Sequence, residues 1–288
     1  MTVTGTTLVI GATGTTGSRT VAQLAAAGHR VRAASRNATG GVGGQAGAKA
    51  ITFDWYDPAT HAAALDGVDR LYLVPPVGDS DPAAVMLPFL RQARSAGVLR
   101  AVLLSSSAIP EGGPAVGKVH QALPGLFEQW AVLRPSWFMQ NFTGTHLHAA
   151  GIRADGTIRS ATADGRVGFV DADDIAAVAV HALTDEQAPD TDLVITGPEA
   201  LSYDDIAAIT TEVTGRPVVH HQLSYEEMRD HLTSTALIPP EFAAMLAGMD
   251  RAIAEGAEDR VTDTVQHLTG RPARTFRAVL EREHAGPR

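Results

Sequence analysis

Three evenly spaced glycines near the start of the chain form the first pattern with a chemical use. Gly11, Gly14 and Gly17 follow the apolar residues 8–10 and precede a helical pattern. Such glycines permit a sharp turn, close approach of a pyrophosphate, and tight packing of helix on strand. Because the first N–H groups of a helix are free and its N-terminus is the positive end of its dipole, the turn predicts a phosphate site. The residues expected to bind a dinucleotide here are Gly11, Thr13, Gly14, Thr15, Thr16 and Gly17.

The end of the second predicted strand, residues 30–36, carries a residue suited to a phosphate. Ser35 and Arg36 end this strand, Arg32 lies on it, and no acidic residue occurs from His29 to Arg36. A protein that binds NAD usually places an acid here for the ribose 2′-hydroxyl. A guanidinium instead donates two parallel hydrogen bonds to a phosphate. The pattern favours NADP(H) over NAD(H); a solvated strand end is the alternative explanation for Arg36.

Candidates for proton transfer are few. Four residues after the four tyrosines stand Thr60, Pro76, Ala207 and Arg229, so the Tyr-x-x-x-Lys pair of typical short-chain dehydrogenases is absent. Lys118, between the fifth and sixth predicted strands, would need burial to lower its pKa toward acid–base use. Ser106 directly follows the fifth strand, where its hydroxyl could face a cofactor. A solvated lysine and a serine that satisfies a turn are the ordinary explanations for both.

Aromatic and amide side chains follow the sixth predicted strand. Trp137 could stack on a flat or cationic substrate, while Gln140 and Asn141 could orient its polar end. If this stretch is helical, the three share a face, because they are three and four residues apart. They are the predicted substrate pocket. Phe138 and Phe142 are expected to be core residues that hold the segment to the sheet.

These residues need a scaffold that brings distant segments together. After the first strand, further apolar strands are predicted at residues 30–36, 50–54, 71–74, 101–104 and 130–133, alternating with helices. This alternation predicts an α/β fold, a Rossmann-type doubly wound parallel sheet covered on both faces. Ligands of such sheets lie beyond the carboxyl ends of the strands. The strand ends expected to converge on one cleft are Gly11, Ser35, Arg36, Asp54, Val74, Pro75, Ser105, Ser106 and Pro135.

The alternation weakens beyond about residue 150. We therefore predict an NAD(P)-binding domain over residues 1–200 and a small, mostly helical C-terminal lobe over residues 201–288 on the substrate side. The acidic residues at 171–174 are explained by the start of a helix better than by a metal. The histidines have no metal-ligand spacing, and residues 37–47, rich in glycine, are expected to form a mobile loop.

Composition excludes several classes of function. The 288 residues carry a net charge of −9 and contain no cysteine, which excludes disulfides and thiolate chemistry. No Lys/Arg cluster suggests a nucleic-acid surface, and no apolar run is long enough for a membrane span. With no signal peptide recognised, the expected protein is cytoplasmic, a monomer or homodimer, and acts on a small-molecule substrate.

Several segments together resemble a known family. Residues 11–17 and 133–142, the run Phe169-Val170-Asp171-Ala172-Asp173-Asp174-Ile175-Ala176 and the ending 270–276 are similar to the NmrA-like branch of atypical short-chain dehydrogenase/reductases. More narrowly, residues 53–55, 74–76, 112–114 and 130–135 resemble the ergot-alkaloid festuclavine and agroclavine dehydrogenase group, which reduces an iminium carbon with NADPH and also lacks the Tyr–Lys pair.

The resemblance implies roles for three positions and leaves the function open between alternatives. It implies that Arg36 holds the 2′-phosphate, that Asp54 lies by the adenine, and that Pro135 onward borders the nicotinamide. The leading expectation is an NADPH-dependent reductase of an imine or iminium, or of a conjugated C=C or quinone. The alternatives are a non-catalytic NADP(H)-sensing regulator, since the family contains such proteins, and a nucleotide-sugar epimerase, disfavoured because epimerases normally rely on the Tyr–Lys pair.

Overall fold

The computed structural model describes residues 5–37, 47–235 and 238–285. The chain divides into two compact units, and each is assembled from three separate segments. The first unit comprises residues 1–135, 172–195 and 264–271, and the second comprises residues 136–171, 196–263 and 272–288. The predicted mobile loop over residues 37–47 falls mostly on residues 38–46, outside the described part.

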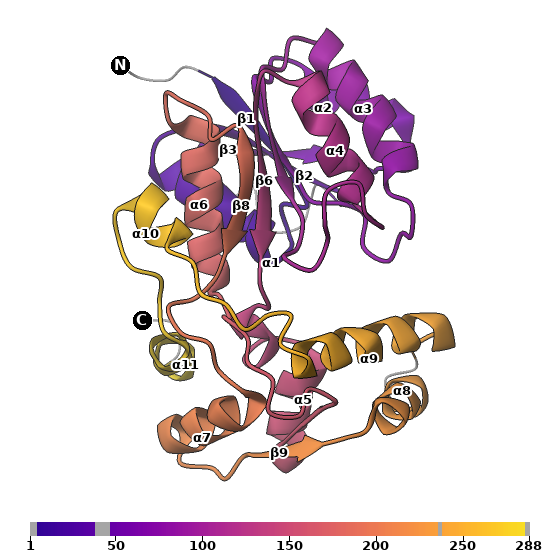
Figure 1. Cartoon of the computed structure of the whole chain (residues 1–288). Coiled ribbons are helices and arrows are strands. Elements are labelled where there is room, and N and C mark those ends of the chain that lie inside the picture. Colours follow the sequence, from indigo (N-terminus) through magenta and orange to yellow (C-terminus); the bar gives the residue numbers. More distant parts are fainter. Residues whose placement is uncertain (1–4, 38–46, 236–237, 286–288) are drawn as a thin grey trace. The chain divides into compact units, whose positions relative to one another are not determined.

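A seven-stranded, fully parallel sheet forms the centre of the first unit (Figure 1). Its strands are β1 (Thr6–Ile10), β2 (Arg30–Ser35), β3 (Ala48–Thr52), β4 (Arg70–Leu73), β5 (Arg100–Leu104), β6 (Gln129–Pro135) and β8 (Thr191–Ile195). Their order is β3-β2-β1-β4-β5-β6-β8, so the strand order reverses between β1 and β4. Open α/β sheets bind ligands at such a reversal.

Helices cover both faces of this sheet. They are α1 (Thr15–Ala26), α2 (His61–Leu65), which continues a 3₁₀ turn over Pro58–Thr60, α3 (Ala83–Ser95), α4 (Gly117–Leu126), α6 (Ala172–Thr184) and α10 (Thr264–Thr269). Helices α2, α3 and α4 lie on one face and α6 on the other, where it packs on α1 and α10 (Figure 1). The core under the first group includes Phe53, Trp55 and Phe89, whose rings meet edge to face at 5.0–5.3 Å. Burial of such aromatic area is what holds the helices to the sheet.

The second unit is mostly helical with a small parallel pair of strands. Its elements are a 3₁₀ turn over Met139–Asn141, α5 (Leu147–Asp155), β7 (Thr157–Ser160), α7 (Tyr203–Thr214), β9 (Val219–Gln222), α8 (Tyr225–Ser234), α9 (Pro240–Ala254) and α11 (Phe276–His284). Phe142 lies at the centre of its main core, with ring contacts to Phe169, Tyr203 and Phe276. A separate small core joins α8 to α9 around Leu232.

The predicted Rossmann-type fold is confirmed, and two details of the prediction differ from the structure. The alternation of apolar segments identifies six strands of the sheet but not β8, an edge strand that is half exposed and contains Thr191 and Asp192. The boundaries of the two units also differ from the predicted single break at residue 200. Residues 136–171 leave the sheet before residue 200, whereas residues 264–271 return to it as α10. No helix in the described ranges is long and apolar enough to cross a membrane.

Candidate functional site

In the glycine turn of the first unit, Gly11 and Gly17 have no room for a side chain. Gly11 has φ +75°, and an added Cβ would lie 2.8 Å from the Cβ of Val74, which follows β4. A Cβ on Gly17 would lie 2.1 Å from the carbonyl oxygen of Gly11, so the helix lies directly against the end of β1. The Gly14 N–H donates to this same carbonyl at 2.9 Å, which closes the turn. The predicted strand–turn–helix geometry is therefore present, at the point where the strand order reverses.

The N-terminus of α1 is available to an anion. Gly14 is its N-cap residue, and the first turn holds no acidic residue. Among the described residues, no side chain caps this helix. The first N–H groups of an α-helix have no partner within the helix, here those of Thr15, Thr16 and Gly17. The pyrophosphate of NAD(P)H fits the start of α1. Because glycine has no side chain, such a ligand can come close to the backbone N–H groups.

The two arginines of β2 and its end are in different situations. Arg32 donates to the carbonyl oxygen of Ala63 at 2.7 Å and to Asp66 at 3.2 Å, so α2 holds it. Arg36 is exposed, and no hydrogen bond or ion pair joins it to any described residue. The neighbouring Ser35 hydroxyl donates to the carbonyl oxygen of Asn37 at 2.8 Å. Of the two arginines, Arg36 is thus the one that can bind a phosphate without losing an internal contact.

The other predicted strand ends are held by local hydrogen bonds. The carboxylate of Asp54 accepts the N–H of Tyr56 at 3.0 Å. The carbonyl oxygen of Val74, directly before Pro75, accepts the indole N–H of Trp55 at 3.1 Å. The carbonyl oxygen of Pro135 accepts the N–H of Ser107 at 2.9 Å. The Ser105 hydroxyl oxygen is different, because it is buried without a hydrogen-bond partner in the described part of the chain. A polar ligand bound at this strand end could supply the hydrogen bond that the Ser105 hydroxyl lacks.

The two residues suggested for proton transfer lie in ordinary structural positions. Lys118 is on α4, with 59% of its side chain exposed and its Nζ 3.0 Å from Asp81. It therefore lacks the burial that its predicted acid–base role requires. The Ser106 hydroxyl accepts the N–H of Ala108 at 3.3 Å, as in a turn. Both correspond to the ordinary explanations rather than to the chemical ones.

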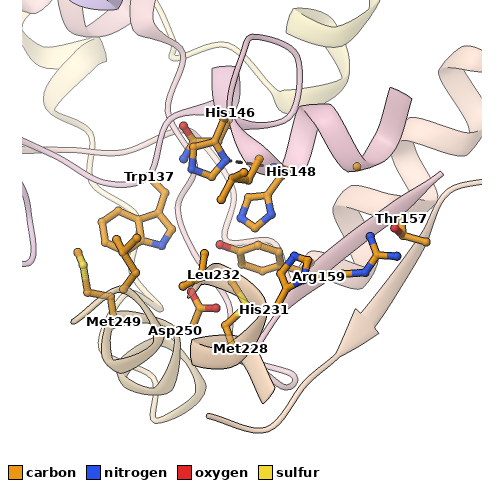
Figure 2. A pocket seen from close by; sticks show the side chains of 15 residues that line it. Trp137, His146, His148, Thr157, Arg159, Met228, His231, Leu232, Met249 and Asp250 are labelled. Atoms are coloured by element: carbon orange, nitrogen blue, oxygen red, sulfur yellow. Dashed lines mark hydrogen bonds between the residues drawn. The ribbon is translucent and has the colours of Figure 1, made fainter. Parts of the chain in front are cut away.

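A cavity of about 210 Å³ lies within the second unit (Figure 2). It is bordered by Trp137, Asn141, His146, Leu147, His148, Gly151, Thr157, Arg159, Tyr203, Met228, His231, Leu232, Leu246, Met249 and Asp250. Trp137, Met249 and Asp250 gather on one side, and Thr157 and Arg159 lie on the other (Figure 2). Apolar walls with a few polar groups are typical of small-molecule sites.

The predicted pocket residues separate in the structure. Trp137 and Asn141 border the cavity, but Gln140 does not. The amide of Gln140 donates to Asp171 at 2.8 Å and to Glu283 at 3.3 Å. The shared helical face is absent, because residues 139–141 form only a 3₁₀ turn and the segment before it pairs with Val170. Phe142 is a core residue as expected, whereas Phe138 is only half buried.

Histidines that lack metal spacing in the sequence meet at this cavity. His146 caps α5, and its Nδ1 accepts the N–H of His148 at 3.2 Å, with the two rings 4.7 Å apart. The two histidines are therefore neighbours at the start of α5. Burial lowers the pKa of His146 and His231, and it lowers the pKa of His148 to about 3. All three are accordingly neutral at pH 7.

Two carboxylates of the acidic run at residues 171–174 form buried ion pairs with arginines. Asp173 and Asp174 lie in the first turn of α6, as predicted. Asp174 is fully buried and pairs with Arg271 at 2.7 Å. Asp171, also fully buried, accepts from Arg282 at 3.1 Å and pairs with Arg274 at 3.4 Å. Buried carboxylates require such partners, so these groups are structural.

Family models match most of the chain. The NAD(P)H-binding model matches residues 11–186, and the model of the NmrA-like family matches residues 128–272. The chain belongs to the NmrA-like family. The first match includes the glycine turn, and the second includes Trp137 and much of the cavity lining.

Relatives of this NmrA-like protein carry oxidoreductase names. It is 44% identical over 269 residues to the uncharacterized oxidoreductase YesF of Bacillus subtilis, covering 93% of this chain and 92% of the relative. It is 38% identical over 289 residues to festuclavine dehydrogenase of Aspergillus fumigatus, covering 97% and 98%. An Escherichia coli NADPH-dependent quinone oxidoreductase solved with NADPH has the same fold, with TM-score 0.80, 23% identity, and coverage of 96% and 99%.

Several residues of the NmrA-like cavity carry no signal in the sequence. Tyr203, Met228 and Asp250 come from three different helices, α7, α8 and α9, with no motif that joins them. Ser202 and Asp205 form a capping box at the start of α7, a pattern of residue types that marks a helix start in a sequence. Tyr203 follows this cap directly, so its position on the helix could be inferred but not its exposure to a cavity.

Proposed function

We propose that the protein is an NADPH-preferring reductase that delivers hydride to a small polarised acceptor, foremost an imine or iminium and otherwise a conjugated C=C or quinone. That it is an NAD(P)H-dependent oxidoreductase follows from its family and its relatives. The preference for NADPH and the acceptor class are the proposal. The observation that carries the proposed reduction of a small acceptor is the cavity of the second unit, which Trp137 borders.

The chain itself connects cavity and cofactor site. Trp137 follows Pro135, the last residue of β6, by two positions. Two peptide units span at most about 7 Å, so covalent geometry keeps the Cα atom of Trp137 within that distance of the Cα atom of Pro135. Ligands of parallel sheets bind beyond such strand ends. The proposal is that the nicotinamide binds beyond β6 and that the acceptor stacks on Trp137.

Each part of the first unit would bind a different part of NADPH. The N–H groups at the start of α1 would bind the pyrophosphate, and the Arg36 guanidinium the 2′-phosphate. Asp54 would lie beside the adenine, and Val74, Pro75 and Ser105 would line the strand ends that the dinucleotide crosses. When bound, NADPH supplies the hydride. The protein's contribution is to orient the acceptor and to exclude water from it.

The acceptor class follows from the absence of the Tyr-x-x-x-Lys pair that usually donates the proton. An iminium already carries the positive charge that attracts hydride, so its reduction needs no proton at that step. The Tyr-x-x-x-Lys pair is absent, and Lys118 and Ser106 have structural partners. A carbonyl or quinone would need a donor to neutralise the developing oxyanion. An iminium, or an imine that is protonated before the hydride transfer, therefore suits this set of residues best.

The test is a panel of iminium salts, imines, enones and quinones, with the loss of NADPH absorbance as the readout. We expect turnover with iminium acceptors, and faster turnover with NADPH than with NADH. Tight binding that depends on the redox state of the cofactor, with no turnover of any acceptor, would overturn the proposal and favour the sensor. Epimerisation of a nucleotide sugar without net NADPH loss would favour the epimerase alternative.

A further inference from the structure

We propose that Asp250 makes the cavity of the second unit select organic cations over neutral molecules of the same shape, with its carboxylate as their counter-ion. The inference rests on the proposed function in one respect, because the cation would be the hydride acceptor. The ligand class is an aromatic iminium ion. Asp250 lies on α9 and borders the cavity on the same side as Trp137 (Figure 2).

The Asp250 carboxylate has one hydrogen bond and no cationic partner. Its Oδ2 accepts the backbone N–H of Ala161 at 2.9 Å. Across residues 5–37, 47–235 and 238–285, no lysine, arginine or histidine forms an ion pair with it. Burial raises the pKa of Asp250 to about 6, and the Ala161 N–H opposes this only in part. The carboxylate is thus mostly ionised at pH 7 and incompletely compensated.

The other polar groups of the cavity do not compensate this charge. Arg159, on the opposite side in Figure 2, is paired with Asp155 at 2.7 Å. His146, His148 and His231 are neutral at pH 7, because burial lowers the pKa of each. Tyr203 is also neutral, since burial raises the pKa of its hydroxyl, and the nearby Asp250 raises it further. The cavity wall therefore carries one uncompensated negative charge.

A ligand cation would remove the main electrostatic penalty of this site. Buried charges in proteins are normally paired, and an unpaired carboxylate in apolar surroundings is unfavourable. Trp137 and Tyr203 add aromatic surfaces suited to cation–π contacts. Met228, Leu232, Leu246 and Met249 make the rest of the wall apolar, which disfavours a small hydrated metal ion and favours an organic one. Charge and shape together define the ligand class.

The experiment compares two probes that differ only in charge, 1-methylquinolinium and 1-methylnaphthalene. Their dissociation constants are measured by NMR titration at about pH 7.5 and about pH 5 on the full chain, on either side of the Asp250 pKa. At the higher pH, wild-type protein should bind the cation at least about tenfold more tightly than the neutral probe, a difference of about 1.4 kcal/mol. The preference should shrink at the lower pH, because Asp250 becomes protonated.

Asp250→Asn keeps the shape and the acceptor for Ala161 and removes the charge. It should bind both probes with similar affinity, with no change between the two pH values. The matched control is Glu255→Gln, which removes the same charge at the exposed end of α9, where Glu255 faces Arg251 at 4.0 Å. It should keep the wild-type preference. The wild-type pH series tests the inference even if Asp250→Asn does not fold.

Three outcomes would overturn the inference: equal affinity of wild-type protein for the two probes, a preference that survives in Asp250→Asn, or no binding of either probe. An Asp250→Asn protein that loses reduction of neutral acceptors only would instead make Asp250 a proton donor. The proposed function fails separately. Absence of NADPH oxidation with every acceptor leaves the binding ratios intact, whereas a missing charge preference can occur in an active reductase.

Discussion

The glycine turn of the first unit and the cavity of the second differ in how the chain builds them. The turn is contained in residues 11–17, and its function depends on backbone N–H groups and on the absence of side chains. The cavity takes its lining from α5, β7, α7, α8, α9 and the segment after β6, and depends on what those side chains are. A backbone site is therefore local and constant, whereas a side-chain site is dispersed and can change its ligand by single substitutions.

The two regions also differ in electrostatics. The first offers fixed dipoles at the start of α1 and an exposed guanidinium at Arg36. The second contains buried groups whose pKa values are displaced, among them His148, lowered to about 3, and Asp250, raised to about 6. We therefore expect the binding of a cationic substrate to weaken as the pH falls below about 6, because Asp250 becomes protonated.

The largest expected effect is on the glycine turn. In Gly17→Ala the new Cβ would lie 2.1 Å from the carbonyl oxygen of Gly11, which is backbone and cannot yield cheaply. We expect the free energy of unfolding to fall by about 3 kcal/mol, the upper range for overpacking, with loss of cofactor binding. Urea unfolding and NADPH titration measure both. Gly125→Ala on α4, where a Cβ meets nothing within 4 Å, is the control and should be nearly neutral.

Asp250→Asn should stabilise the protein. Folding raises the pKa of this carboxyl from 3.8 to about 6, so the folded state binds its proton more tightly than the unfolded state does. The penalty is absent below about pH 4, grows as the pH rises to about 6, and is constant above, at up to about 3 kcal/mol. Thermal unfolding across pH checks this. A variant with the same advantage at pH 4 as at pH 7 would contradict it.

Arg36→Ala should change cofactor choice without changing the fold. Loss of hydrogen bonds to a charged phosphate weakens NADPH binding by about 1.5–3 kcal/mol, roughly 10- to 150-fold, and leaves NADH binding unchanged. Calorimetric titration of both cofactors measures the ratio. Arg32→Ala is the matched control, because Arg32 is held by Ala63 and Asp66 and its loss should not alter the ratio. Equal weakening of NADPH and NADH by Arg36→Ala would remove the basis for the preference.

The smallest effect is expected at Lys118. Its ion pair with Asp81 is exposed on both sides, and such pairs contribute less than about 1 kcal/mol. Lys118→Ala should leave both the melting temperature and the turnover of NADPH almost unchanged. A large loss of turnover with intact cofactor binding would make Lys118 a proton donor after all.

The predictability of each region follows from this contrast. The turn and six strands of the sheet could be predicted, because glycine spacing and apolar runs are local signals. Strand β8 could not, since residues 191–195 are half exposed at the edge. Residues 264–271 return to the first unit as α10, a long-range contact for which one sequence holds no signal.

The candidate site was predictable where it follows a strand. Trp137 and Asn141 could be selected as candidates because they follow β6, and both border the cavity. Gln140 lies between them in sequence but is bound by Asp171 and Glu283, which only the fold brings near. Asp250 could not be singled out, because its missing partner is a property of its surroundings and not of its neighbours in the chain.

One measurement tests most directly whether the two regions divide the work of a reductase: NADPH affinity and acceptor KM for Trp137→Ala beside Arg36→Ala. Trp137→Ala should raise the KM of an iminium acceptor about tenfold or more, by loss of aromatic contact, with NADPH affinity within about twofold of wild type. Arg36→Ala should instead weaken NADPH binding and leave the KM of the iminium acceptor nearly unchanged. If Trp137→Ala instead abolishes NADPH binding, or leaves the acceptor KM unchanged, the cavity is not the substrate site.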